Sequence, residues 1–183
     1  MKDIMIDIET FGTGSNSIIV SISAVNFDIS TGAIGDKFEV GIDLKEQIRS
    51  GAHIDVDTVV WWLGQPKEAQ EELLKIERID VKTALELLNA WILNIDYPNK
   101  DMKLWGNGAT FDNVIVRNLY RRENIEFPLP FWCDNDVRTL VNLSDLNLKS
   151  YAFEGTKHNG IDDCMHQINY CVDAYKTVKG GFA

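Results

Sequence analysis

The sequence has few cysteines and prolines, and it has no long apolar run. Its 183 residues include 3 cysteines, 4 prolines and 13 glycines. The odd cysteine count, without paired spacing, argues against a disulfide framework and favours a reducing compartment, so we expect a cytoplasmic protein. The scattered prolines and glycines exclude collagen-like and low-complexity chains. No stretch approaches the ~18 consecutive apolar residues of a membrane span, and acids within the first apolar run argue against a signal peptide.

Positive charge is also scarce. The chain has 18 Lys and Arg against 28 Asp and Glu, which gives a formal net charge of −10. This balance excludes a protein that binds nucleic acid through a broad basic surface. It leaves a protein with no polyanionic partner, or one that meets a polyanion through bound metal. With 45% hydrophobic residues, the chain is expected to fold as one soluble domain over residues 1–183.

The hydrophobic pattern predicts an α/β domain. Residues 3–8, 18–28 and 36–42 are expected to form three antiparallel strands. Residues 103–105 and 131–133 are typical of two further strands. Helices are expected over 67–77 and 80–93, after the cap Thr110, after Asp136, and over 161–178. The sequence therefore predicts a mixed sheet of five strands, antiparallel first and parallel later, flanked by helices.

The strongest local feature is the pair Asp7 and Glu9 at the end of the first strand. Alternate residues of a strand point to the same face, so these carboxylates start about 6–7 Å apart at the backbone. Unpaired carboxylates this close repel, and they need a cation, a proton or an arginine nearby. Hard divalent metals bind such oxygens. A solvated strand end is the plain alternative.

Two weaker features come later in the chain. Asp112 follows the turn at Gly106–Gly108, near the carboxyl end of a strand, where α/β sheets bind their ligands. It could instead merely complement a helix dipole. His158 precedes the last helix and Asp163 lies in its first turn, so the histidine could act as a general base and the acid as a metal ligand. Alternatively His158 is a surface loop residue, and Asp162 competes with its neighbour for the ligand role.

Taken in this order, the three motifs resemble the DEDDh family of 3′–5′ exonucleases, which share a ribonuclease-H-like fold. The resemblance spans residues 4–178. Trp105–Gly108 before Phe111, the pair Trp61–Trp62, and Asp136–Thr139 are similar to one branch of the family. That branch holds the phage DexA-type exonucleases, the exodeoxyribonuclease VIII-like proteins and the ribonuclease AS type.

The chain departs from the commoner family pattern at two positions. Gly108 stands where the second motif more often has Asn, and Gly160 stands where the third motif usually has Ala. Both residues are small, so we expect the metal geometry to be unharmed. The first departure leaves open which contacts are made to the substrate backbone.

The resemblance implies a phosphodiester hydrolase that shortens single-stranded nucleic acid from a free 3′ end, with DNA slightly favoured and RNA as the alternative. Two divalent ions, Mg²⁺ or Mn²⁺, would assist. Their implied ligands are Asp7, Glu9, Asp112 and Asp163. Asp7 would bridge the ions, and His158 would take the proton from the attacking water. By analogy with relatives, a homodimer is also expected.

Contacts to the strand end are expected from residues beside the motifs. The candidates are Thr10, Phe11, Gly12, Trp61, Trp62, Asn107 and Phe111. Aromatic side chains stack on any base, which suits an enzyme without sequence preference. At most one of two adjacent helical tryptophans faces the core squarely, so one is free for substrate or a partner. Candidate phosphate contacts are Lys149, Lys157, Arg117, Arg121 and Arg122.

Two other functional classes remain open. The first is a non-catalytic module that binds nucleic acid or a partner, which has no need for four clustered acids. The second is a metal-dependent phosphatase that acts on nucleotides, which differs only in the length of its substrate. A zinc site made by His158, Cys164 and His166 is not favoured, because Cys164 and Cys171 lie two turns apart on one amphipathic helix and are expected to pack.

Overall fold

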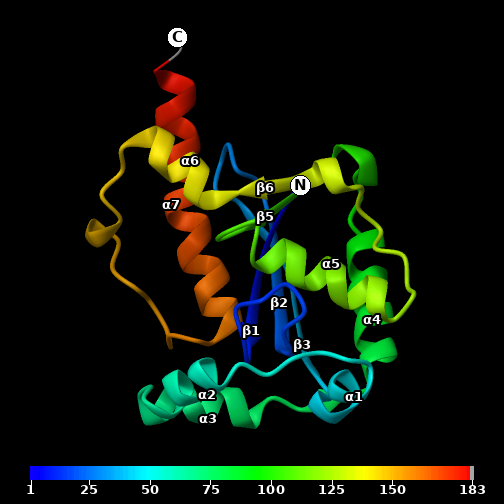
Figure 1. Cartoon of the computed structure of the whole chain (residues 1–183). Coiled ribbons are helices and arrows are strands. Elements are labelled where there is room, and N and C mark those ends of the chain that lie inside the picture. Colours follow the sequence, from blue (N-terminus) through cyan, green and yellow to red (C-terminus); the bar gives the residue numbers. More distant parts are fainter. Residues whose placement is uncertain (182–183) are drawn as a thin grey trace.

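A six-stranded mixed sheet runs through the middle of the molecule (Figure 1). The structure is a computed structural model that describes residues 1–181. The strands are β1 (Asp3–Thr10), β2 (Ile19–Phe27), β3 (Ile34–Ile42), β4 (Arg78–Ile79), β5 (Lys103–Gly106) and β6 (Asp134–Asp136). Their spatial order is β4-β3-β2-β1-β5-β6. The first three strands pair antiparallel, and β4, β5 and β6 each pair parallel with a neighbour.

Helices cover both faces of the sheet and one end of it (Figure 1). The α-helices are α1 (Leu44–Arg49), α2 (Val56–Leu63), α3 (Lys67–Lys75), α4 (Val81–Leu93), α5 (Asp112–Arg122), α6 (Val137–Ser144) and α7 (Gly160–Gly180). Short 3₁₀ helices span η1 (Asn99–Asp101), η2 (Phe131–Cys133) and η3 (Leu148–Ser150). Helices α4 and α5 pack on one face, and α6 and α7 pack on the other, while α2 and α3 lie beyond the carboxyl end of β1 (Figure 1).

The alternation of β1 decides which face receives the acids. Ile4, Ile6 and Ile8 belong to the core cluster beneath α4 and α5. Met5 belongs to the opposite cluster, beneath α6 and α7. Because strand side chains alternate, Asp7 and Glu9 continue the face of Met5 toward the carboxyl end of the strand. The sheet therefore carries both carboxylates to the start of α7.

The predicted α/β class and the order of antiparallel and parallel strands are confirmed, but the count of five strands is wrong. The additional strand β4 has only two residues, which pair with Gly41 and Ile42. Such a segment is too short to carry a periodic pattern. The strand expected at Phe131–Cys133 is instead the helix η2. The paired strand comes directly after it and consists of the polar residues 134–136, whose composition hides a strand.

Two helix predictions also need correction. Phe111 and not Thr110 holds the N-cap position of α5, and among the described residues no side chain caps this helix. The Gly108 carbonyl instead accepts the N–H groups of Phe111 and Asp112. Helix α1 lies outside the predicted elements, because its six residues are too few for a clear helical repeat. Within residues 1–181, no helix combines the length and the apolar character that crossing a membrane requires.

Candidate active site

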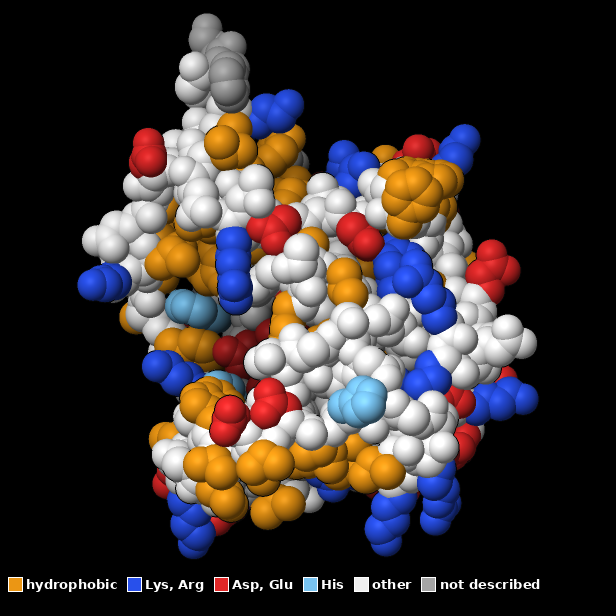
Figure 2. Space-filling view, in the orientation of Figure 1, with side chains coloured by type: hydrophobic (Ala, Val, Ile, Leu, Met, Phe, Trp, Pro, Cys, Tyr) orange, Lys and Arg blue, Asp and Glu red, His pale blue; other side chains and the backbone are white. Residues whose placement is uncertain are grey.

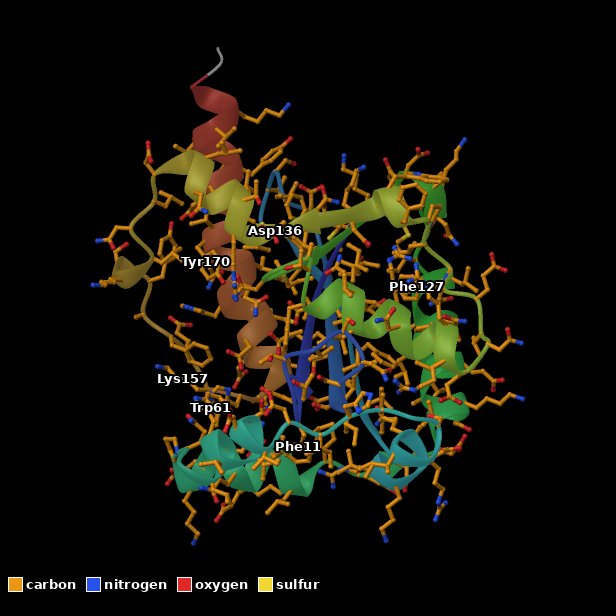
Figure 3. The ribbon with its side chains drawn as sticks, viewed as in Figure 1. Phe11, Trp61, Phe127, Asp136, Lys157 and Tyr170 are labelled. Atoms are coloured by element: carbon orange, nitrogen blue, oxygen red, sulfur yellow. The ribbon has the colours of Figure 1, made fainter. Side chains whose placement is uncertain are left out.

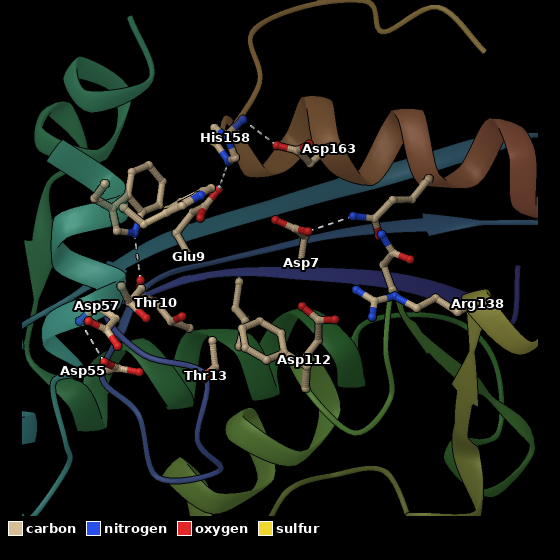
Figure 4. A pocket seen from close by; sticks show the side chains of 17 residues that line it. Asp7, Glu9, Thr10, Thr13, Asp55, Asp57, Asp112, Arg138, His158 and Asp163 are labelled. Carbon is tan, nitrogen blue, oxygen red and sulfur yellow. Dashed lines mark hydrogen bonds and ion pairs between the residues drawn. The ribbon is translucent and has the colours of Figure 1, made fainter. Parts of the chain in front are cut away.

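A cavity of about 670 Å³ lies at the carboxyl end of β1 (Figure 4). In the space-filling view, acidic side chains lie deep in a hollow of the face shown (Figure 2). Ten residues singled out from the sequence line this cavity: Asp7, Glu9, Thr10, Trp61, Trp62, Asn107, Phe111, Asp112, His158 and Asp163. They come from segments up to 156 positions apart in the chain, so folding brings them together. Phe11 and Gly12 are not among the lining residues.

Asp7 is held by a side chain of α7. The Gln167 Nε2 donates to Asp7 Oδ1 at 2.8 Å. Burial raises the pKa of Asp7 well above its ordinary value, and the charges of the other three candidate ligands raise it further. The amide of Gln167 lowers this pKa only in part. Among the residues that the structure describes, Asp7 therefore has one neutral side-chain donor and no cation beside it.

Asp112 enters the cavity from the first turn of α5 and is 3% exposed. Burial raises the pKa of Asp112 to about 7, although nearby backbone N–H groups lower it in part. Gly106 makes this approach possible, because a Cβ there would lie 3.1 Å from Cβ of Asp112 and would overlap the Asn113 side chain. The glycine of the predicted turn thus lets α5 pack against the end of β5.

His158 and Asp163 meet at the start of α7. The backbone N–H of His158 donates to Asp163 Oδ2 at 2.8 Å, and His158 has a positive φ of 66°. The ring Nδ1 lies 3.6 Å from Glu9 Oε1. This contact with Glu9 raises the pKa of His158, and burial opposes the rise. Burial raises the pKa of Glu9 and of Asp163, and His158 lowers both in part.

Glu9, His158 and Asp163 form a group that could hold a metal ion. Each offers one ligand atom, and these atoms lie within 4.8 Å of one another. Gly160 lets α7 come this close to the sheet, because a Cβ there would overlap Ser23 and would lie 3.7 Å from Asp7 Oδ2. The glycine at this departure from the commoner family pattern is therefore required by close packing.

Asp162 points elsewhere. Its Oδ2 accepts the backbone N–H of Thr156 at 2.8 Å. Its own N–H is accepted by Oδ1 of Asn159, the N-cap of α7. Of the two adjacent acids, the structure brings Asp163 and not Asp162 to the cavity.

The two tryptophans of α2 differ in burial. Trp62 is 4% exposed, and its Nε1 donates to the Thr10 carbonyl at 2.9 Å. Trp61 is 49% exposed. Both rings meet the His158 ring edge to face, with centroids 5.3 Å (Trp61) and 5.2 Å (Trp62) away. One tryptophan is therefore a core residue and the other offers an open aromatic surface beside the histidine.

The remaining predicted contacts fall into separate groups. Gly12 serves the turn after β1, since a Cβ there would lie 2.5 Å from Ser17 Oγ. Arg117 is bound internally by Asp134 and two carbonyls, and Arg122 donates to Asn16 and Ser50. Lys149 and Arg121 are exposed and do not line the cavity, whereas the exposed Lys157 precedes His158 in the chain.

Cys164 does not support a zinc site. Its side chain is 0% exposed, with the carbonyls of Met5 and Ser23 as partners. His166 packs its ring against Phe153 and Tyr170. The cysteine therefore packs in the core, as the amphipathic pattern of the last helix predicts.

Several cavity residues were not among the predicted site residues: Thr13, Asp55, Asp57, Thr58, Arg138 and Gln167. A signal for Gln167 was available, because it lies four residues after Asp163 and so shares its helix face. Asp55 is the N-cap of α2, accepting the N–H of Asp57. Arg138 lies in the segment Asp136–Thr139 that carries the family resemblance, but its approach to the cavity depends on tertiary packing.

Comparison with known proteins gives a consistent set of likenesses. A family model described as "3'-5' exoribonuclease Rv2179c-like domain" matches residues 2–174. The protein "Exodeoxyribonuclease" of Enterobacteria phage T4 is 26% identical over 199 residues, covering 92% of this chain and 86% of the phage protein.

Solved structures show the same fold. The nuclease domain of 3'hExo, a DEDDh family member bound to rAMP, matches 95% of this chain and 91% of that one, with a TM-score of 0.64 and 12% identity. E. coli Exonuclease I in complex with a dT13 oligonucleotide gives a TM-score of 0.65 and 14% identity over 98% of this chain. The chain spans only 42% of that structure. It spans 63% of cell-death related nuclease 4, at a TM-score of 0.65 and 14% identity. These matches confirm the predicted ribonuclease-H-like fold.

Proposed function

Because this chain belongs to the Rv2179c-like 3′–5′ exoribonuclease domain family and is a 3′–5′ exonuclease of the DEDDh type, we propose that it is metal-dependent and that its four cavity acids are the ligands. Asp7, Glu9, Asp112 and Asp163 would hold two divalent ions, Mg²⁺ or Mn²⁺. We propose that residues 1–183 form one exonuclease domain. Residues 182 and 183 lie outside the described residues.

The convergence of these four carboxylates carries the proposal. Burial raises the pKa of each one, so the ionised set is costly without positive charge beside it. Carboxylate oxygens are the ligands that Mg²⁺ and Mn²⁺ prefer. A binding module has no reason to bury acids that repel one another, whereas a site for divalent ions requires them.

Bound divalent ions would neutralise the phosphate and make water a stronger nucleophile. His158 accepts the proton of the attacking water, since its ring reaches the acid cluster at Glu9 and is flanked by both tryptophans. The water oxygen joins phosphorus, the bond from phosphorus to the 3′ oxygen of the preceding nucleotide breaks, and that oxygen takes up a proton from solvent to become the new 3′-hydroxyl. The products are a nucleoside 5′-monophosphate and a strand shorter by one nucleotide. Gln167 fixes the orientation of Asp7 during this step.

The terminal nucleotide would lie on the side of the cavity formed by α2. The exposed ring of Trp61 offers a stacking surface there, and Phe111 and Asn107 also line the cavity. Thr10 lies at the same side, but its hydroxyl already donates to the Gly12 carbonyl at 2.7 Å. Sequence-tolerant stacking on Trp61 suits an enzyme that removes any base.

We propose single-stranded DNA as the favoured substrate and RNA as the alternative. The likeness to the phage exodeoxyribonuclease over 92% of the chain supports DNA. The description of the matching family, an exoribonuclease domain, supports RNA. A direct competition between the two substrates is therefore part of the test.

The test uses 5′-labelled single-stranded DNA and RNA with Mg²⁺ or Mn²⁺. We expect a ladder that shortens from the 3′ end and disappears with EDTA. Asp163→Asn should abolish cleavage, and the matched control Asp162→Asn should keep it. Binding without cleavage, unaffected by chelator, would contradict the proposal and favour a binding module. Cleavage of mononucleotides alone would favour a phosphatase.

Two further predictions concern location and assembly. The buried free thiols of Cys133, Cys164 and Cys171 support a reducing compartment, and we propose the cytoplasm. A homodimer remains a prediction from the family resemblance, which light scattering of the purified protein tests.

A further inference from the structure

Arg138 brings a positive charge into an otherwise acidic cavity. Among the described residues that line the cavity, it is the one Lys or Arg. It is the second residue of α6, and its guanidinium points toward Asp112 (Figure 4). Its charge lowers the pKa of Asp112, against the larger effect of burial. The side chain thus reaches the edge of the acid cluster from a helix that contributes no acid to it.

The corner between β6 and α6 fixes this position. Asp136, where the strand passes into the helix (Figure 3), accepts the N–H of Thr139 through Oδ1 and the N–H of Ala109 through Oδ2, both at 2.6 Å. The carboxylate therefore ties the first turn of α6 to the turn after β5. Gly108 in that turn has a φ of 128°, and a Cβ there would lie 3.5 Å from Arg138 Cζ. Bare backbone lies beneath the guanidinium.

The guanidinium itself is free to bind an anion. Within residues 1–181, no hydrogen bond or ion pair holds Arg138, and the residue is exposed. Arg117, by contrast, is bound by the Asp134 carboxylate at 2.8 Å and by two backbone carbonyls. A guanidinium presents several donors in a rigid fork that matches phosphate oxygens. Held on a fixed backbone and left without protein partners, Arg138 is suited to this role.

We propose that Arg138 binds the phosphate next to the scissile one, on its 5′ side, in the strand that remains after cleavage. Figure 4 shows Arg138 and Thr10 on opposite sides of Asp7. If the terminal nucleotide lies beside α2, the strand leaves the acids on the Arg138 side. This inference rests on the proposed function and adds the direction of the strand and the residue that guides it.

The experiment compares the first cleavage of two oligonucleotides of the preferred sugar. One has phosphodiesters throughout, and the other has one uncharged methylphosphonate at the second linkage from the 3′ end. In the wild type, the neutral linkage should lower kcat/KM by about 10- to 100-fold, as expected when a charge-assisted hydrogen bond is lost. On the plain strand, kcat/KM of Arg138→Ala should be lower than that of the wild type by a similar factor. In this variant, the methylphosphonate should lower kcat/KM no further. Arg138→Lys should fall between them.

Controls separate this role from a structural one. Melting temperature should be unchanged in Arg138→Ala and Mn²⁺ affinity should not fall, because the variant removes a positive charge beside Asp112. Lys82→Ala, which removes an exposed charge on α4, should cleave like the wild type. Wild-type rates in Arg138→Ala, or an equal methylphosphonate effect in both proteins, would overturn the inference. So would slow cleavage of a dinucleotide by Arg138→Ala, because a dinucleotide has no second linkage. A wild type that fails to cleave the plain strand would instead refute the proposed function.

Discussion

Replacing Asp112 by Asn should change how the stability of the metal-free protein depends on pH. Burial raises the pKa of Asp112 from 3.8 to about 7. Between these values the folded state keeps a proton that the unfolded chain has lost. Stability therefore falls as pH rises, by ~1.4 kcal/mol per pH unit, and it levels off above the folded pKa. From pH 5 to pH 8 this one group removes about 3 kcal/mol from the free energy of unfolding.

In Asp112→Asn, the side chain is neutral at every pH, so this part of the slope should vanish. We expect the variant to match the wild type near pH 5 and to exceed it by about 2–3 kcal/mol at pH 8, while losing nuclease activity. Urea unfolding in EDTA at both pH values measures this directly. Glu86→Gln, an exposed acid on α4, is the charge control and should leave the slope unchanged. An identical pH dependence in the wild type and Asp112→Asn would refute the reasoning that buried carboxylates destabilise the metal-free fold.

Three other substitutions test separate parts of the site. His158→Gln should lower kcat by ~10²- to 10⁴-fold with a similar Mn²⁺ affinity by calorimetry; loss of Mn²⁺ binding would make the histidine a ligand instead of a base. Trp62→Ala should lower the free energy of unfolding in urea by ~3–5 kcal/mol. Trp61→Ala should barely change stability and should raise KM by about tenfold, because a stacking surface is lost. Equal effects of the two substitutions would contradict their difference in burial. Gln167→Leu removes the donor that orients Asp7. This variant should bind Mn²⁺ ~10- to 100-fold more weakly, with little change in melting temperature. Unchanged Mn²⁺ binding would show that the amide is dispensable.

The four acids predicted from the sequence line one cavity, and each of them lies on a regular element. Asp7 and Glu9 lie two apart on a strand, and Asp112 and Asp163 each lie in the first turn of a helix. Strand alternation alone places Asp7 and Glu9 on one face, whereas the family resemblance singled out Asp112 and Asp163 as their partners. The lining of the cavity on the α2 side is harder to predict. Asp55 reaches the cavity only because its backbone N–H donates to the Phe11 carbonyl at 2.7 Å, which fixes the start of α2 beside the end of β1.

The strand β6 shows a different limit. Its residues Asp134 to Asp136 are all polar, so neither hydrophobicity nor β-propensity indicates a strand. Two of the three side chains accept tertiary hydrogen bonds: Asp134 from Arg117, and Asp136 from the N–H of Ala109. The strand was predicted at the apolar segment just before it, Phe131–Cys133, because the prediction relied on composition. Residues 134–136 form a strand because they pair with β5. Such pairing depends on the tertiary fold and not on the local sequence.

The acidic net charge of −10 includes a group of acids concentrated in the cavity. The acids that line the cavity are Asp7, Glu9, Asp55, Asp57, Asp112 and Asp163, with Arg138 at the edge. Without divalent ions this surface repels a phosphate, and two bound divalent ions would offset four of these negative charges at the point where the phosphate binds. Binding free energies are reciprocal, so any ion that increases the affinity for the strand end must itself bind more tightly when the strand is present. An acidic protein can therefore bind a polyanion at one point, through ions that the substrate helps to hold, while the rest of its surface stays unattractive to nucleic acid.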